Sequence, residues 1–96
     1  MTNMLISGIY QIINLVDPEK YYIGSAVNLR QRQRDHWSTI RRNKHRNIHL
    51  QNAWNLYGKD NFRFVPLILC SIKDLKFYEQ GLLDRLHPYY NIAISA

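Results

Sequence analysis

The first quarter of the chain alternates between short apolar runs and polar turn residues. Gly8 to Leu15 is rich in β-branched and aromatic residues, and Tyr21 to Gly24 repeats that character. Between these runs lies Asp17-Pro18-Glu19-Lys20, in which the Asp-Pro pair supplies turn chemistry. The pattern therefore predicts a β-hairpin over residues 8–24.

The middle of the chain changes to helical spacing. Ser25 or Asn28 is a suitable N-cap for a first helix that runs to about Arg42. A second helix follows the candidate N-cap Asn47 and ends before Gly58, where a C-terminal glycine is expected. Its apolar residues recur at i, i+3, i+4 and i+7, and they are Leu50, Ala53, Trp54 and Tyr57.

A third strand and a last helix complete the pattern. Phe62 to Leu69 is strand-like, although Pro66 donates no ladder hydrogen bond and therefore indicates an edge strand or a bulge. Ser71 with Asp74 opens the last helix, Pro88 lies past its end, and Tyr89 to Ile94 has an extended pattern. The order strand–strand–helix–helix–strand–helix predicts an α+β domain in which helices cover a small sheet.

Length and composition narrow the class of protein. The 96 residues suffice for one modest core, so we expect a single domain over residues 1–96. No apolar run approaches the ~18 residues that span a bilayer, and the first residues lack the basic region of a signal peptide. Cys70 is the only cysteine, so an internal disulfide is excluded, which fits a reducing compartment. We expect Cys70 itself to be a core residue, because it closes an apolar run. We therefore expect an intracellular protein that is not secreted and has no membrane partner.

The net charge of +6 is concentrated in one segment. Residues 30–46 hold seven basic residues and one acid, whereas the six basic and six acidic residues elsewhere cancel. Such a segment attracts phosphate backbones through counterion release, without sequence preference. The alternative is a solvated helix face, but this concentration favours nucleic acid. The basic residues are Arg30, Arg32, Arg34, Arg41, Arg42, Lys44 and Arg46.

Two tripeptides of the predicted hairpin carry a family resemblance. Gly8-Ile9-Tyr10 and, twelve residues on, Tyr22-Ile23-Gly24 resemble the paired signature that names the GIY-YIG nucleases. Either tripeptide alone is a weak signal, but the rest of the family pattern follows in order: Ser25, Arg32, His36, His45, Glu79 and Asn91. The resemblance covers about Ile6 to Ala93. It is closest to the catalytic domains of group I intron homing endonucleases, which share the Gly-Ser-Ala after the second tyrosine and the terminal Tyr90-Asn91-Ile92-Ala93. It implies a small three-stranded antiparallel sheet flanked by helices, with the active site on one sheet face.

The resemblance implies roles for two charged residues, and elementary chemistry supports both roles. Phosphodiester hydrolysis needs an activated water, a charge clamp on the pentavalent phosphate and help for the leaving oxygen. Glu79 is a hard oxygen ligand that suits Mg²⁺, or another divalent cation such as Mn²⁺, and a lone glutamate indicates a single metal ion. Arg32 offers a planar fork that binds a phosphate bidentately.

Proton transfer is expected to involve Tyr10, Tyr22 and His36. We expect Tyr10 to act as the base on the water, His36 to relay or accept its proton, and Tyr22 to orient the phosphate or the water. A tyrosine with an ordinary pKa of ~10 is rarely ionised at neutral pH, so His36 as the direct base remains an alternative. Arg32 and His36 are four residues apart and share a helical face, which supports a joint role.

Two further positions enter through the resemblance. His45 matches a family position close to the scissile phosphate. Asn91 also matches the family pattern, and its alternative role is structural, in a turn or in a backbone hydrogen bond that holds the site. The spacing of His45 and His49 suggests zinc as well, but no cysteine pair or third ligand accompanies them, so a structural zinc is not favoured.

The main candidates also have ordinary structural interpretations. Tyr10 and Tyr22 are compatible with plain strand aromatics, and Arg32 with one more solvated charge. Glu79 differs, because it lies on the apolar side of the last helix, four residues after Leu75. An unpartnered glutamate is costly to bury there, so a nearby cation or metal ion is expected.

The leading hypothesis is a metal-dependent endonuclease that acts on double-stranded DNA, of the homing-endonuclease type. The alternatives are a non-catalytic nucleic-acid-binding module on the same fold, or a repair or restriction nuclease. We find no zinc finger or helix-turn-helix, so the chain is either a catalytic fragment of a longer enzyme or a standalone nuclease with little specificity. A monomer is favoured, in the cytoplasm or in an organelle whose intron encodes it. Phosphate contacts are expected from Arg30, Arg34, Arg41, Arg42, Lys44 and Arg46.

Overall fold

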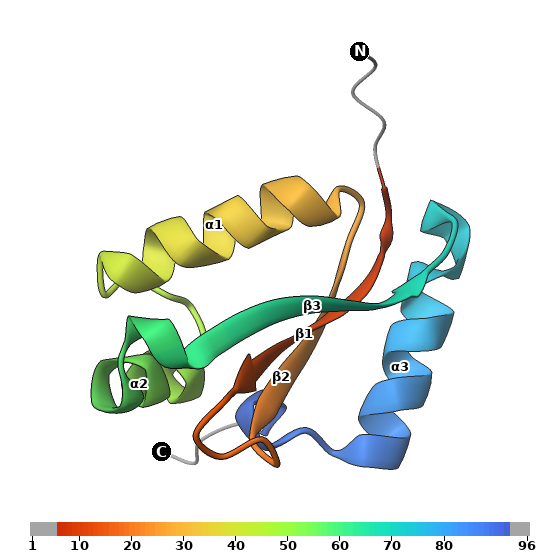
Figure 1. The fold of residues 1–96 in the computed structure, drawn as a ribbon. Coiled ribbons are helices and arrows are strands. Elements are labelled where there is room, and N and C mark those ends of the chain that lie inside the picture. The colour runs from red at the N-terminus through yellow and green to blue at the C-terminus, as the bar shows by residue number, and fades with distance from the viewer. Residues whose placement is uncertain (1–5, 93–96) are drawn as a thin grey trace.

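The computed structural model describes residues 6–92 and has the predicted α+β architecture (Figure 1). Its helices and strands follow the predicted order: β1 (Gly8–Asn14), β2 (Tyr21–Ala26), α1 (Leu29–Arg41), α2 (Ile48–Tyr57), β3 (Phe62–Leu69) and α3 (Leu75–Leu86). Short 3-10 turns lie between and after them: η1 (Lys59–Asn61), η2 (Ile72–Asp74) and η3 (Tyr89–Asn91). Over the described range, every helix is too short or too polar to cross a membrane.

The sheet is antiparallel and has the strand order β2-β1-β3, so both β2 and β3 are edge strands. β1 pairs with β2 in one continuous register that places Tyr10 opposite Gly24. On its other side, the pairing of β1 with β3 shifts between Ile9 and Tyr10, where Pro66 faces Tyr10. Pro66 therefore lies in an edge strand beside a bulge, as its missing N–H predicted.

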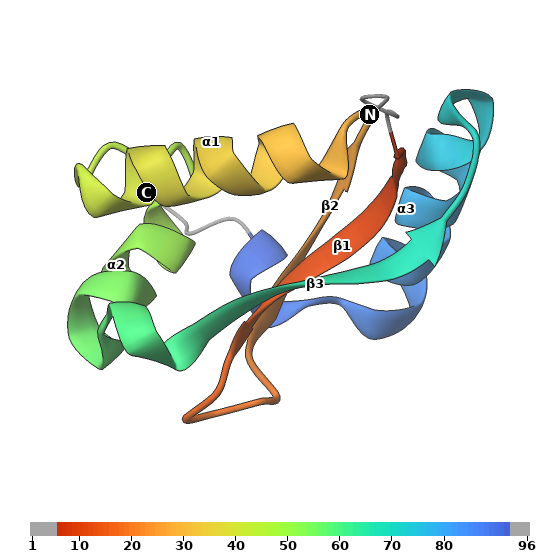
Figure 2. The same ribbon diagram turned by 45° about the horizontal axis from the view of Figure 1, so that its top comes forward.

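Helices cover both faces of the sheet. In Figures 1 and 2, α1 and α2 lie together on one side of the sheet and α3 lies on the other. The main core is on the α1–α2 side, and its buried members are Tyr10, Ile12, Ala26, Leu29, Ile40, Leu50, Ala53, Phe62 and Tyr90. By contrast, α3 has no fully buried side chain. The polar side chains of α3 therefore remain at least partly exposed to solvent.

Local signals set the start of α1 and both ends of α2. Asn28, rather than Ser25, caps α1, because its side chain accepts a backbone N–H of the first turn at 3.1 Å. Asn47 caps α2 in the same way, at 3.0 Å. Gly58 ends α2 with φ of +94°, a backbone conformation in which a side chain would be strained.

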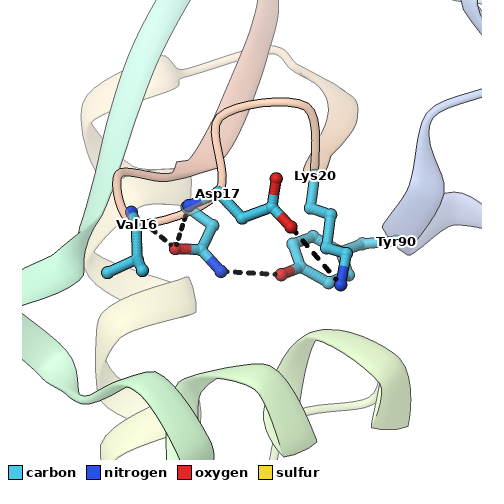
Figure 3. Close-up of polar contacts among 5 residues, drawn as sticks. Val16, Asp17, Lys20 and Tyr90 are labelled. Carbon is cyan, nitrogen blue, oxygen red and sulfur yellow. Dashed lines mark hydrogen bonds and ion pairs between the residues drawn. The ribbon is translucent and has the colours of Figure 1, made fainter.

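Asn14 joins the hairpin turn to the C-terminal turn η3. Its Oδ1 accepts the backbone N–H groups of Val16 at 2.9 Å and Asp17 at 3.3 Å, and its Nδ2 donates to the hydroxyl of Tyr90 at 3.2 Å. Lys20 and Asp17 pair across the same turn at 3.5 Å (Figure 3). Asn14 and Tyr90 are almost fully buried, so this link fixes the end of the described chain against the hairpin.

Three sequence-based expectations were wrong in detail. β2 continues to Ala26, past the predicted end of the strand. Tyr89–Asn91 forms a 3-10 turn rather than an extended segment, because the side chain of Tyr90 is buried against the hairpin; residues 93–94 lie outside the described range. Cys70 is only half-buried where β3 ends, so it is not a core residue.

Candidate active site

A cavity of about 510 Å³ opens beside the free edge of β2. The hairpin, α1, the loop after it and α3 all contribute side chains to its walls. The structure brings together six of the seven residues predicted to be catalytic: Tyr10, Tyr22, Arg32, His36, His45 and Glu79. The seventh, Asn91, does not line the cavity.

The cavity spans the edge of the sheet rather than one face of it. Strand alternation places Tyr22 and Gly24 on the same face as Tyr10, towards α1, and turns Ser25 to the opposite face. From that opposite side, Glu79 on α3 meets Ser25, whose hydroxyl donates to Oε1 at 2.6 Å. The site implied on one sheet face is therefore completed from both, around the strand that has no outer neighbour.

The two glycines of the paired signature are required for steric reasons. A Cβ on Gly24 would lie 2.5 Å from the hydroxyl oxygen of Tyr10 and 2.7 Å from its ring carbon Cζ. A Cβ on Gly8 would overlap the backbone carbonyl oxygen of Ile68 in β3. Gly24 thus makes room for a site side chain, whereas Gly8 makes room for the neighbouring backbone.

A chain of hydrogen bonds runs from the loop before α2 to Tyr10. The backbone N–H of Asn47 donates to Nδ1 of His45 at 3.0 Å. Nε2 of His45 lies 2.7 Å from Nδ1 of His36, and Nε2 of His36 lies 2.6 Å from the hydroxyl oxygen of Tyr10. The rings of His36 and His45 are stacked, with centroids 5.0 Å apart.

The first donor of this chain sets the direction of every bond in it. Because Nδ1 of His45 accepts the Asn47 N–H, the proton of a neutral His45 is on Nε2, which donates to His36. Nδ1 of His36 then accepts, its proton is on Nε2, and that N–H donates to Tyr10. The reverse direction would require a His45 ring without a proton. The hydroxyl of Tyr10 therefore accepts from His36 and is left to donate its own proton elsewhere.

Burial keeps both imidazoles neutral near pH 7. It lowers the pKa of His36 to about 4, helped by the neighbouring His45 and Arg32. Burial likewise lowers the pKa of His45. It raises the pKa of Tyr10, as does the adjacent Tyr22, while the Arg32 guanidinium opposes both effects. Burial and then the Glu79 carboxylate raise the pKa of Tyr22, again against Arg32.

Gln51 belongs to this network, and sequence reasoning missed it. Its side chain is only 2% exposed, and Oε1 accepts the backbone N–H of His45 at 3.0 Å. Its Nε2 donates to the carbonyl of Ile40 at 3.0 Å and to Asn55 at 3.1 Å. The available signal was weak: a glutamine next to the apolar stripe of a short helix. Gln51 fixes the backbone of His45, as Asn47 fixes its ring.

Asn91 holds the free edge of β2 from outside the cavity. Its Oδ1 accepts the backbone N–H of Ile23 at 2.7 Å, and its Nδ2 donates to the carbonyl of Ile23 at 2.8 Å. The side-chain amide therefore takes the place of a neighbouring strand at the residue between Tyr22 and Gly24. This geometry favours the structural interpretation of Asn91.

The predicted phosphate-binding residues divide between the cavity and the surface. Arg46 lines the cavity with Arg32. The others, Arg30, Arg34, Arg41, Arg42 and Lys44, are exposed. Among the described residues, the only ion pair joins Lys20 and Asp17, so none of these cations is within ion-pair distance of a carboxylate in that range. Nor do three His, Cys, Asp or Glu side chains gather anywhere in residues 6–92 to hold a metal ion.

We predict opposite effects of the same substitution at two glycines. Gly24→Ala should lower the free energy of unfolding by about 1–3 kcal/mol, because the new methyl group overlaps the Tyr10 hydroxyl. Gly81→Ala is the control, since its Cβ meets nothing within 4 Å in helix α3, and it should stabilise the protein by up to about 1 kcal/mol. Urea unfolding measures both values. Equal stability of Gly24→Ala and the wild type would contradict the steric account.

The depressed pKa of His36 predicts a pH-dependent stability. The folded protein holds this imidazole neutral down to about pH 4, whereas the unfolded chain protonates it near 6.5. Stability is therefore complete above pH 6.5 and falls by about 3 kcal/mol as the pH drops to about 4. His36→Phe should lose that part of the pH dependence and keep the part due to other groups. Parallel curves of unfolding free energy against pH for the two proteins would rule out a neutral, buried His36.

Comparison with known proteins identifies the family. The family model of the GIY-YIG catalytic domain matches residues 6–91. The chain is 34% identical over 77 residues to Intron-associated endonuclease 1 of Enterobacteria phage T4, a match that covers 80% of this chain and 28% of that protein. The solved catalytic domain of homing endonuclease I-TevI is similar in structure, with a TM-score of 0.78 and 28% identity over 84% of this chain and 88% of that one. A mutant of the same catalytic domain gives a TM-score of 0.71 at 27% identity, over 95% of this chain and 98% of that one. This chain therefore belongs to the GIY-YIG family of nuclease catalytic domains.

Proposed function

We propose that this chain is a metal-dependent endonuclease domain that hydrolyses phosphodiester bonds of double-stranded DNA. The observation that carries the proposal is the meeting of Tyr10, Tyr22, Arg32 and Glu79 in one cavity, although they come from three separate parts of the fold. The phage relative is named an intron-associated endonuclease, and the similar structure is that of a homing endonuclease, which supports the homing type. The chain spans little more than a quarter of that relative, so the proposal concerns cleavage and not target choice.

A divalent cation, Mg²⁺ or Mn²⁺, fits the acidic side of the cavity. One oxygen of Glu79 accepts the hydroxyl of Ser25, and no basic side chain of the described residues pairs with this carboxylate. A single hard carboxylate with open space around it suits an ion that keeps several waters. When bound, the ion would stabilise the charge that develops on the phosphate. Ser25 orients the carboxylate that would hold it.

In this proposal Arg32 binds the phosphate and opposes the rise in the pKa values of Tyr10 and Tyr22. It lines the cavity from the first turn of α1, one helical turn before His36. Its charge favours the ionised form of both tyrosines, against the burial that raises their pKa values. A guanidinium that clamps the phosphate while it favours a phenolate serves both binding and proton transfer.

The direction of the hydrogen-bond chain supports Tyr10, rather than His36, as the base. In the neutral chain both nitrogens of His36 are engaged, because Nδ1 accepts from His45 and Nε2 donates to Tyr10. His36 therefore has no free lone pair for a proton from water or from Tyr10. Its N–H can stabilise a Tyr10 phenolate, which forms when the Tyr10 hydroxyl gives its proton to solvent water on the cavity side. In this proposal His36 and His45 hold the base in place, and Tyr22 orients the phosphate or the water.

Removing the Glu79 charge should abolish cleavage and leave the fold intact. Glu79→Gln keeps the size of the side chain and its hydrogen bond with Ser25 but loses the charge that a hard dication prefers. Nicking of supercoiled plasmid in Mg²⁺, with and without EDTA, measures the effect, and circular dichroism checks folding. Undiminished nicking by Glu79→Gln, or by the wild type in EDTA, would contradict the single-metal mechanism.

Arg32, which lines the cavity, should differ in kind from Arg42, which lies at the other end of α1 and outside the cavity. Arg32→Ala should reduce the rate constant of cleavage at saturating protein by a factor of about 10² or more, as for other groups that stabilise a transition state. Arg42→Ala removes an equal charge at an exposed position and should mainly weaken DNA binding and flatten its salt dependence. Single-turnover kinetics separate these effects. Equal losses of rate in the two variants would mean that Arg32 contributes only electrostatic attraction.

A further inference from the structure

Helix α1 carries two separate stripes of side chains, and only one of them faces the active-site cavity. Arg32, Asp35, His36 and Thr39 follow the spacing i, i+3, i+4, i+7 and line that cavity. A second stripe begins two residues earlier with Arg30 and continues at i+3, i+4, i+7 and i+11. Its members are Arg30, Gln33, Arg34, Trp37 and Arg41. Most arginines of the basic segment that lie on α1 are therefore turned away from the catalytic residues.

The second stripe borders a groove of its own. A hollow of about 400 Å³ lies between α1, α2 and the start of β3, and Gln33, Trp37 and Arg41 form its α1 wall. Figure 1 shows the end of α1, the helix α2 and the start of β3 gathered at one end of the molecule, and Figure 2 shows the same arrangement. Trp54 of α2 lies opposite Trp37, with ring centroids 5.5 Å apart.

Two cations from outside residues 30–46 also line this groove in the folded protein. Lys59 in η1 and Arg63 in β3 lie outside the basic segment, where charges cancel along the chain, yet both line the groove with Arg41. All three are exposed, and the one acid in the lining is Asp60. None of the three is within ion-pair distance of a carboxylate in residues 6–92. The groove therefore has an excess of positive charge, and the indole rings of Trp37 and Trp54 are part of its lining.

We propose that this groove, together with the Arg30–Arg34–Arg41 stripe, is a second DNA-binding surface that holds the sugar–phosphate backbone of the duplex arm beside the cleavage site. This inference rests on the proposed function and adds where the rest of the substrate lies. The stripe is ~17 Å long, which corresponds to about five base-pair steps of a duplex, so it meets several successive phosphates. The three exposed cations supply charge complementarity, and α1 lies between this surface and the cavity.

The chain provides its own reporter for this surface. It contains two tryptophans, and both line the groove. DNA bound there changes the environment of both indoles, whereas DNA bound only at the active-site cavity leaves them untouched. A titration of Glu79→Gln protein with a duplex of about 20 base pairs, followed by tryptophan emission and by fluorescence anisotropy of labelled DNA, reads groove occupancy and total binding together.

The decisive comparison is between two double variants of equal charge change. Lys59→Glu with Arg63→Glu alters the groove; Lys73→Glu with Arg85→Glu alters η2 and the end of α3, away from both hollows. All four positions are exposed, so both proteins should fold, and thermal melting checks this. The groove variant should bind the duplex about tenfold more weakly than the control variant, for any DNA sequence, and its plot of log Kd against log salt should be shallower by about two. The groove variant should also lack the change in tryptophan emission that accompanies DNA binding.

Each outcome separates the inference from the proposed function. Equal affinity and equal salt dependence of the two double variants would overturn the second surface, even if the wild type cleaves DNA. Weaker binding of the groove variant alone, together with full cleavage by Glu79→Gln, would overturn the catalytic proposal and keep the DNA-binding surface. If the tryptophan emission of the Glu79→Gln protein did not change on saturation with duplex, the proposal that DNA occupies the groove would also be overturned.

Discussion

The position of the Tyr10 hydroxyl depends on the register of the hairpin, and the rest of the site depends on that hydroxyl. In this register Gly24, which has no side chain, is the residue opposite Tyr10. The ring of Phe64 in β3 stacks on Tyr10 from the other side, with centroids 4.4 Å apart. His36 then meets the hydroxyl at 2.6 Å. A shift by one residue would turn every β2 side chain to the opposite face and place Ile23 or Ser25, rather than Gly24, opposite Tyr10. An error in strand pairing would therefore also disrupt the site.

The two buried histidines of the site, His36 and His45, are held in their neutral forms. The backbone N–H of Asn47 at the start of α2 sets the protonation of His45, and through it that of His36. Burial prevents either ring from taking up a second proton near pH 7. Because Asn47 also caps α2 and Gln51 of α2 holds the backbone of His45, the first turns of that helix are part of the site. Folding of α2 and alignment of Tyr10 are thus coupled.

Much of the fold could be predicted from local patterns in the sequence, whereas most of the cavity residues were predicted through the resemblance to the GIY-YIG nucleases. Hairpin runs, helix caps and Pro66 act within a few residues, and the paired signature fixes Tyr10 and Tyr22. What escaped prediction depends on residues far apart in the chain. Gln51 gains its role only when the loop of His45 folds over α2. The C-terminal turn forms because Tyr90 finds Asn14, 76 residues earlier, and no local pattern contains that pair.

The two sides of α1 differ in charge, and this difference matches the two roles that we propose for the basic segment. On the cavity side, Arg32 and Arg46 lie with Asp35 and Glu79, so the positive charges there are balanced and act through position. On the groove side, Arg41 is joined by Lys59 and Arg63 against a single acid, so attraction dominates. Under the two proposals, DNA affinity and catalysis therefore draw on different residues of one helix. Because cations on both sides suit phosphates, which carry no sequence information, neither side by itself discriminates one DNA sequence from another. Selection of a target must then depend on base contacts or on DNA deformation, which phosphate contacts alone do not supply.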